Sequence, residues 1–500
     1  MPLSLFNTLG REVQEFKSIK QGEVGFYACG PTVYNYAHIG NLRAYVTHDI
    51  LARVLRRRGF ALTHVMNITD VGHLTGDSDE GDDKMVKSAE ERGKSVLEVA
   101  EFYTKAFFSD TERLNIARPD IVCKATEHIS DMIALIKRLE EKGFTYQAGG
   151  NLYFDIAKFP NYAELARLKL DALQAGARIE VDGNKRNPED FVLWFTKSKF
   201  ANQALVWESP WGRGYPGWHI ECAAMSIKYL GEQFDIHAGG IDHIQIHHSN
   251  EIAEAEAATG VHPWVRCWVH NEFLVLGAKG KMSKSAGGFI TLQNLIDEGF
   301  DALDYRYFLL GGHYRTQLQF SLESLTGARN ARKSLATLLR NLAAAAAAAS
   351  GSASGTSSLA SDKVRAVPSE GAGGAAAVHL AAFDAALDDD INVPRALASL
   401  WGVLKDAALP PADALATAFS MDEVLGLRLR EEAAKAGSRN EDAALCAEVE
   451  ALIAERAAAK KQKDFAKADS IRAALKERGI LLEDTPRGTV WTAPRAAVPQ

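Results

Sequence analysis

Residues 24–68 read VGFYACGPTVYNYAHIGNLRAYVTHDILARVLRRRGFALTHVMNI and predict the core of the fold. The apolar run 24–29 is typical of a buried strand that ends in a turn, and residues 61–68 predict a second strand. Between them, aliphatic residues recur every fourth position, as on one face of a helix: Leu42, Val46, Ile50 and Val54. A strand, a helix and a strand in succession form a βαβ unit, which predicts a parallel sheet of the nucleotide-binding kind.

The rest of the chain extends this unit into a multidomain α/β protein. We predict a Rossmann-type parallel sheet split by an insertion, followed by a helical bundle and a small C-terminal α/β domain. Residues 343–377, rich in Ala, Ser and Gly, predict a flexible insertion within the bundle. The predicted ranges are a first half of the catalytic domain at 1–118, a connective insertion at 119–205, a second half at 206–260, a stem at 261–325, the bundle at 326–430 and the C-terminal domain at 440–500.

The composition and charge of the chain exclude several classes of protein. The 500 residues include 57 basic and 64 acidic side chains, and a net charge of −7 excludes a wholly basic nucleic-acid coat. No apolar run is long enough to span a bilayer, and the N-terminus lacks the pattern of a signal peptide. The cysteines are few and scattered, at 29, 123, 222, 267 and 446. We therefore expect a protein of the reducing cytoplasm rather than a disulfide scaffold.

Two short motifs carry the first chemical signal, HIGN at 38–41 and KMSKS at 281–285. Each alone is weak, because a histidine at a helix start is commonly a cap and a Lys/Ser stretch is commonly a solvated loop. Together, in this order and on this fold, they resemble the signature of class I aminoacyl-tRNA synthetases. The resemblance implies that His38 and Asn41 contact the phosphates of ATP, and that Lys281 and Lys284 neutralise the leaving pyrophosphate.

A second set of residues concerns metal binding: Cys29, Cys222, His247 and Glu251. His247 and Glu251 are four apart and would project from one face of a helix. Two thiolates, one imidazole and one carboxylate make a plausible tetrahedral zinc site. Spacing alone favours the alternative, inert buried cysteines, because no compact CxxC pair is present.

The segments around these residues resemble cysteinyl-tRNA synthetases. They are CGPTVY at 29–34, GWHIEC at 217–222 and HHSNE at 247–251. The resemblance implies one Zn²⁺ per subunit, ATP with Mg²⁺, and L-cysteine and tRNA(Cys) as substrates of a monomer. It further implies that zinc selects the cysteine thiol over the serine hydroxyl without an editing domain. The implied adenosine and nucleotide contacts are Gly40, Gly239, Gly240 and Asp242, and the implied cysteine pocket includes Gly30, Thr69 and Trp218.

Further segments of the chain resemble the helical bundle and the anticodon-reading domain of the same family. The bundle-like segments are 301–315 and 383–397, and the C-terminal one is 460–491. Residues 455–478 contain eight basic and four acidic residues, and this local excess of positive charge suits contacts with phosphate. Trp491 is available for stacking on a base. A solvated helix face is the alternative for this charged run.

Three features depart from the family pattern. Asn41 stands where HIGH is commoner, and Gln245 and Ile246 replace Phe-Pro before the histidine pair. An acidic insertion at 71–81 contains His73, for which a solvated loop residue is the plainer interpretation. Two other functions stay open at this point: a ligase that joins cysteine to an amino-sugar, as in mycothiol synthesis, and a non-catalytic RNA-binding paralogue.

Overall fold

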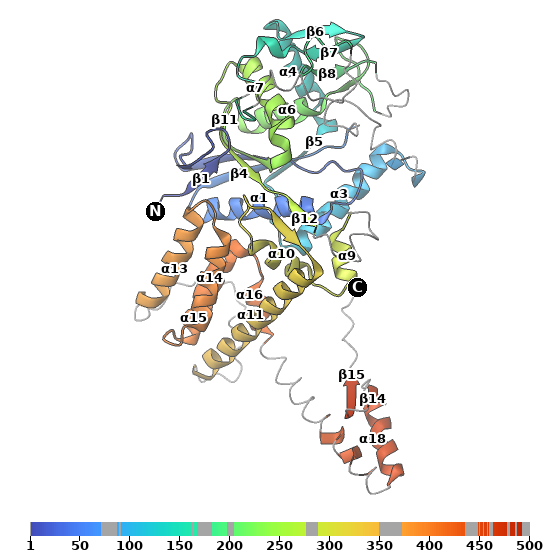
Figure 1. The fold of residues 1–500 in the computed structure, drawn as a ribbon, viewed down its shortest axis with the longest axis vertical. Coiled ribbons are helices and arrows are strands. Elements are labelled where there is room, and N and C mark those ends of the chain that lie inside the picture. Colours follow the sequence, from blue (N-terminus) through green and yellow to red (C-terminus); the bar gives the residue numbers. More distant parts are fainter. Residues whose placement is uncertain are drawn as a thin grey trace. The chain divides into compact units, whose positions relative to one another are not determined.

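The computed structural model divides the chain into two compact units, residues 1–338 with 366–429 and residues 339–365 with 430–500 (Figure 1). The residues that the structure describes are 2–71, 88–89, 92–162, 164–167, 183–197, 205–276, 289–349, 373–435, 449, 451–453, 455–457, 459, 464–477, 481–485 and 488–492.

A five-stranded sheet forms the centre of the first unit, and all its neighbouring strands are parallel. Its order is β11-β10-β3-β4-β5, so the chain leaves β3 in one direction and later returns on its other side. The strand order therefore reverses between β3 and β10, which is where doubly wound sheets bind ligands. The strands are β3 (Glu23–Ala28), β4 (Ala61–Ile68), β5 (Ile121–Lys124), β10 (Phe234–Gly240) and β11 (Val265–Asn271).

Helices cover both faces of this sheet, with α1 and α3 on one side and α6 and α7 on the other (Figure 1). The apolar stripe predicted for the first helix lies on α1, and its four residues are all buried against the sheet or its neighbours. The predicted βαβ unit and the α/β fold class are thereby confirmed. The helices are α1 (Ile39–Arg57), α3 (Val96–Arg113), α4 (Ile129–Glu141), α6 (Trp218–Leu230) and α7 (His247–Thr259).

A second sheet, antiparallel, follows α4 and separates the two halves of the parallel one. Its strands are β6 (Thr145–Ala148), β7 (Asn151–Phe154), β8 (Phe191–Phe195) and β9 (Tyr215–Pro216). The range 119–205 predicted for the insertion does not coincide with this sheet. It includes β5, which belongs to the parallel sheet, and it stops before β9. Both strands are too short for hydrophobic periodicity to assign them to a sheet. The predicted domain ranges remain predictions.

Short elements complete this part of the first unit. Strands β1 (Ser4–Asn7) and β2 (Glu12–Glu15) form an antiparallel pair, and β12 (Leu274–Leu276) pairs in parallel with β13 (Leu318–Phe320). Three 3₁₀ turns are η1 (Ala125–Glu127), η2 (Ile156–Lys158) and η3 (Ile241–Ile244).

The described residues after 297 are largely helical, as expected for the predicted bundle. The seven-alanine run at 343–349 is the end of α11, and residues 373–377 begin α13, so both ends of the stretch predicted to be flexible are helical. Alanine has the highest helix propensity, which explains the difference at the first of these ends. Residues 350–372 lie outside the described part. The helices are α9 (Leu292–Asp297), α10 (Ala302–Leu310), α11 (Leu322–Ala349), α13 (Gly373–Asp388), α14 (Val393–Lys405), α15 (Pro411–Leu425) and α16 (Leu429–Ala434).

One buried arginine joins α1 to the helical part of the first unit. Arg306 of α10 is fully buried and donates to the carboxylate of Asp49 on α1, at 2.7 Å. It also donates to the carbonyl oxygens of Leu114 and Leu425, at 2.9 and 2.7 Å. Because a buried guanidinium needs several acceptors, this arginine ties three segments distant in sequence to one point.

The second unit contains α18 (Phe465–Glu477) and an antiparallel hairpin of β14 (Leu481–Thr485) and β15 (Gly488–Thr492). Val449, Ile471 and Leu475 form a small core. Arg456, counted above among the basic residues of a phosphate-binding face, is buried and cannot contribute to such a face. No helix in the described parts of the chain combines the length and apolar character that a membrane span requires.

Candidate functional site

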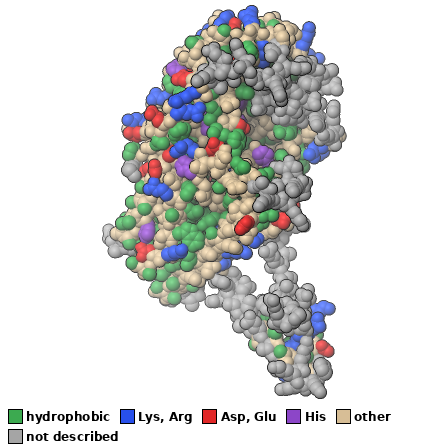
Figure 2. Space-filling view, viewed as in Figure 1, with side chains coloured by type: hydrophobic (Ala, Val, Ile, Leu, Met, Phe, Trp, Pro, Cys, Tyr) green, Lys and Arg blue, Asp and Glu red, His purple; other side chains and the backbone are tan. Residues whose placement is uncertain are grey.

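A cavity of about 460 Å³ opens at the carboxyl ends of β3, β4 and β10. Its volume lies within the range of small-molecule sites, and its place at the reversal of strand order is the usual one for this fold. On the face of the described residues drawn in Figure 2, basic and acidic side chains are interspersed rather than gathered into a field of one sign. The cavity is lined by most of the predicted site residues that the structure describes.

The deep end of the cavity brings together the four predicted metal ligands. Cys29 follows β3, Cys222 lies on α6, and His247 and Glu251 lie one turn apart on α7. Their ligand atoms all lie within 4.8 Å of one another, and all four residues are buried. We call this cluster the deep wall. Segments separated by nearly 200 residues in sequence thus converge on one point.

A second layer of histidines orients the deep wall. His237 Nε2 lies 2.8 Å from Glu251 Oε2, and His219 Nδ1 lies 2.9 Å from His247 Nδ1. The other carboxylate oxygen, Glu251 Oε1, is buried without a hydrogen bond and lies 2.9 Å from His247 Nε2. Metal ligands are commonly held in this way, with the far atom of each ligand fixed by a neighbour.

Two other groupings around Cys29 also have the spacing of a metal site. One combines Cys29 with His243, His247 and His248, and the other combines it with His237, His248 and Glu251. His248 Nε2 lies 3.3 Å from Cys29 Sγ, while its Nδ1 lies 2.8 Å from His270. The deep wall differs from both of these groupings because it contains two thiols, which zinc favours as ligands.

The charges of the deep wall are strongly coupled. Against the effect of burial, the hydrogen bond with Cys222 and the charge of His248 hold the pKa of Cys29 well below its usual value. The same hydrogen bond raises the pKa of Cys222. Burial opposes ionisation of the other pair too, yet Glu251 raises the pKa of His247 to about 10, and the two neighbouring histidines lower that of Glu251 to about 2. Binding of a cation at the wall therefore requires Cys222 and His247 to release their protons, because a metal ligand must be a thiolate, a neutral imidazole or a carboxylate.

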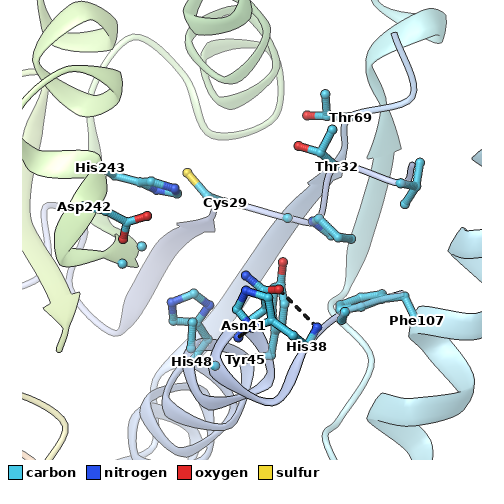
Figure 3. A pocket seen from close by; sticks show the side chains of 18 of the residues that line it. Cys29, Thr32, His38, Asn41, Tyr45, His48, Thr69, Phe107, Asp242 and His243 are labelled. Atoms are coloured by element: carbon cyan, nitrogen blue, oxygen red, sulfur yellow. Dashed lines mark hydrogen bonds between the residues drawn. The ribbon is translucent and has the colours of Figure 1, made fainter. Parts of the chain in front are cut away.

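The opposite side of the cavity is the start of α1. His38 is the N-cap of this helix: its Nδ1 accepts from the amide of Asn41 at 3.1 Å, and Asn41 Oδ1 accepts from the amide of His38 at 3.2 Å (Figure 3). No acidic residue occupies the first turn. A helix start without acidic neighbours attracts phosphate, so capping and phosphate binding are both open to His38 and Asn41.

Glycines bring the backbone close to the cavity. A Cβ at Gly30 would lie 1.6 Å from the carbonyl oxygen of Asn67, and one at Gly239 would lie 2.7 Å from the rings of His243 and His248. Only glycine fits at these two positions. Gly40, Gly240 and Asp242 also line the cavity, and Figure 3 shows Asp242 beside His243, across the cavity from Thr69.

The two predicted side chains of the cysteine pocket lie beside the deep wall. Trp218 stacks on His247 with ring centroids 4.2 Å apart. Thr69 donates to Glu221 at 3.0 Å, and burial raises the pKa of Glu221 well above its usual value. Four polar residues of this region were not predicted from the sequence: Glu221, His219, His237 and His248. Their signal was present in GWHIEC, DIHAGG and HHSNE, where polar residues lie within buried elements.

Several predicted residues lie outside the described part of the chain. They are Lys281 and Lys284 of KMSKS, and His73 of the acidic insertion. The side chain of Trp491 is not described either. Their assignments stay predictions.

Known proteins resemble this chain over most of its length. Residues 15–330 match the family described as the tRNA synthetases class I (C) catalytic domain, and residues 442–491 match the cysteinyl-tRNA ligase anticodon binding domain. The cysteine–tRNA ligase of Treponema denticola is 58% identical over 98% of this chain and 99% of its own length. That of Treponema pallidum is 46% identical over the same shares.

A solved structure shares the fold at lower identity. Methionyl-tRNA synthetase of Mycobacterium tuberculosis, bound by methionyl-adenylate, has a TM-score of 0.53 and 18% identity, covering 83% of this chain and 91% of its own. At this identity the likeness speaks for the fold alone.

Proposed function

This chain belongs to the cysteine–tRNA ligases, which are class I aminoacyl-tRNA synthetases, and on that premise we propose that it charges tRNA(Cys) with L-cysteine. The family predicted from the motifs is confirmed. In the proposed reaction, a carboxylate oxygen of cysteine attacks the α-phosphorus of ATP, pyrophosphate leaves, and the cysteinyl group passes to a ribose hydroxyl at the 3′ end of the tRNA.

One observation supports this proposal above the others: two thiols, an imidazole and a carboxylate converge within 4.8 Å at the buried end of the cavity. The donor set suits Zn²⁺, since soft sulfur ligands, neutral imidazole and one carboxylate are its usual partners. We propose that Cys29, Cys222, His247 and Glu251 hold it. When bound, zinc supplies a soft Lewis acid that binds a thiolate in preference to a hydroxyl.

The residues around the deep wall then position the amino acid. Trp218 lies flat against His247 and closes one side of the pocket. Gly30 lines the same cavity, and its lack of a side chain allows its backbone to lie close to the carbonyl oxygen of Asn67. Thr69 faces the same space with its hydroxyl held by Glu221. Because cysteine and serine differ by one atom, shape alone discriminates weakly, and the ligand chemistry of the deep wall must supply the selectivity.

The start of α1 serves the phosphates. His38 and Asn41 lie at the positive end of a 19-residue helix, where backbone amides and the macrodipole favour negative charge. Adenylation moves no proton at its central step, so rate enhancement rests on positioning and on charge stabilisation. ATP brings Mg²⁺ at its phosphates. Lys281 and Lys284 remain the proposed partners of pyrophosphate, and Gly40, Gly239, Gly240 and Asp242 those of the nucleotide.

The matched anticodon-binding domain favours tRNA over an amino-sugar as the acceptor. We propose that residues 440–500 contact the tRNA, so that deleting them weakens charging far more than adenylate formation. Equal loss of both activities would contradict that role. A monomer and a cytoplasmic location are kept as proposals, on the composition given above.

The test is charging of unfractionated tRNA with labelled cysteine, run beside cysteine-dependent ATP–pyrophosphate exchange and a zinc assay of the same preparation. We expect one zinc per chain, exchange with cysteine but not serine, and label at the tRNA 3′ end. Exchange without charging would favour the amino-sugar ligase. Folded, zinc-loaded protein that does neither would favour a non-catalytic paralogue.

A further inference from the structure

Two exposed aromatic rings meet beside the mouth of the cavity. Tyr36 belongs to the turn between β3 and α1, and Phe102 lies on α3. Among the described residues, three aromatic side chains are more than two-fifths exposed, and these are two of them, each at 42%. Their ring centroids lie 6.0 Å apart with planes at 75°, so they form a nearly right-angled corner open to solvent. We call this pair the aromatic corner.

The corner is held in place from behind. Tyr103, which is buried, meets Tyr36 edge-on at 5.1 Å and supports the ring from the helix side. Ser88 donates to the carbonyl oxygen of Tyr34 at 2.8 Å, which ties the segment before α3 to the same turn. Exposed rings on a supported backbone are typical of a contact surface, since an isolated ring gains little by staying in water.

Positive charge accompanies the rings. Lys94 Nζ lies 5.3 Å from the centroid of Phe102, and the guanidinium of Arg92 lies 5.1 Å from that of Tyr103. Two acids on the same helix are already engaged: Glu98 caps the helix through Ser95, and Glu101 pairs with Lys105 at 2.7 Å. The corner therefore combines faces for stacking with cations for phosphate, which is the pattern of single-stranded nucleic-acid sites.

The corner is also continuous with the proposed site. Tyr36 precedes His38 by two residues, and Figure 3 shows Phe107 of α3 pointing toward His38 at the same side of the cavity. A cavity of about 460 Å³ has the size of a site for one small molecule rather than for a run of nucleotides. The nucleotides before the terminal one must then lie outside it, along a wall of the mouth.

We propose that the aromatic corner of Tyr36 and Phe102, with Lys94, is a stacking platform for the unpaired bases next to the 3′ end of the tRNA. The inference rests on the proposed function and adds a positioning role at the same site. A base stacked on one ring meets the edge of the other, and Lys94 turns from Phe102 to the adjoining phosphate. The platform orients the acceptor hydroxyl without touching cysteine or ATP.

Substitutions at Phe102 separate stacking from apolar packing. We expect Phe102→Leu and Phe102→Ala to raise the KM for tRNA about tenfold, as loss of a base–aromatic stack does. Phe102→Trp should stay within about twofold of wild type. Pyrophosphate exchange should change by less than about twofold in all three. Tyr36→Leu should raise the KM for tRNA in the same way as Phe102→Leu, whereas Tyr36→Phe should not.

A shortened RNA locates the contact. A tRNA lacking its unpaired 3′ strand, used as a competitive inhibitor, should bind wild type and Phe102→Leu equally. Unequal binding would overturn the inference, because the ring would then contact another part of the RNA. Equal loss of exchange and charging in Phe102→Leu would overturn it too, since the ring would support the cavity or another segment of the chain. An unchanged KM for tRNA in Phe102→Leu, while wild type charges normally, would overturn it and leave the proposed function standing.

Discussion

The two ends of the cavity differ in how far their side chains are exposed to water. At the deep wall, Cys29, Cys222, His247 and Glu251 are almost fully excluded from water. At the mouth, His38 and Asn41 lie at a helix start, and Tyr36 is two-fifths exposed. Burial makes each charge in the deep wall depend on its partners, whereas at the mouth Asn41 and Tyr36 are exposed and His38 is half-buried.

This difference assigns selection and positioning to different places. In the proposed function, the zinc that the deep wall would hold distinguishes sulfur from oxygen, because a soft metal ion binds a thiolate in preference to a hydroxyl. A solvated mouth can release phosphates and RNA after each turnover. We therefore expect substitutions at the deep wall to abolish activity, and substitutions at the mouth to reduce it by smaller factors.

The largest effect is expected at the deep wall. Cys222→Ala removes one of the proposed ligands, and cysteine-dependent pyrophosphate exchange should fall at least about a thousandfold, since bound metal contributes several kcal/mol. Chelation of wild type should do the same, and added zinc should restore it. The matched control is Cys267→Ala, a buried cysteine on β11 outside the cluster. If Cys222→Ala keeps its zinc and its exchange rate, the assignment of this ligand is wrong.

The next effect is expected at Arg306, which holds α1, the helix whose start forms the mouth, against α10. Arg306→Met removes one of the two arginines that pair with the buried Asp49, the other being Arg53, and we expect a loss of about 3 kcal/mol in the free energy of unfolding. Urea denaturation followed by tryptophan fluorescence measures it. The double variant Asp49→Asn/Arg306→Met should recover part of the loss, because the buried carboxylate charge is then gone and Arg53 keeps its hydrogen bonds to the carbonyl oxygens of Asn115 and Glu423. Zinc content of the folded protein should not change, and a parallel loss of zinc would show that the two ends are not independent.

At the mouth itself, His38→Ala should lower the kcat of pyrophosphate exchange about a hundredfold, the usual cost of one lost donor at developing charge. The KM for cysteine and the zinc content should stay near wild type. The variant His38→Asn distinguishes the role of His38 as helix cap from its proposed contact with the phosphates, because asparagine is as good an N-cap but places no ring beside the phosphates. Wild-type kcat in His38→Asn would reduce the role of His38 to capping the helix.

The smallest effect concerns the strand beneath the deep wall. His64 of β4 is buried and stacks on Phe26 of β3 at 4.4 Å. Burial, aided by Arg56, lowers the pKa of His64 from 6.5 to about 4. The unfolded chain then binds a proton that the folded one refuses. The free energy of unfolding therefore does not depend on the protonation of His64 above pH 6.5, and it decreases as the pH falls from 6.5 toward 4.

Between pH 7 and pH 5 this loss should amount to about 2 kcal/mol. His64→Phe keeps a ring against Phe26 and removes the titration, so its urea midpoint should fall less over the same interval. Identical pH profiles for the two proteins would show that His64 is already charged or solvated in the folded state.

Sequence reasoning was most successful where a local pattern carries the information. The βαβ unit at 24–68 follows from periodicity over adjacent residues. The sheets to which β5 and β9 belong do not follow in this way, because both are short strands whose partner strands are not adjacent in sequence.

The sequence by itself determined the α/β class, the family and the identity of four candidate ligands, because these depend on residue types in short motifs. Only the tertiary structure decided that the four meet in one dry cluster, that His237 and His219 hold them, and that Tyr36 and Phe102 form a corner. The reason is physical: burial and coupling arise when segments up to about 200 residues apart are packed together, and no local pattern encodes which of them will touch.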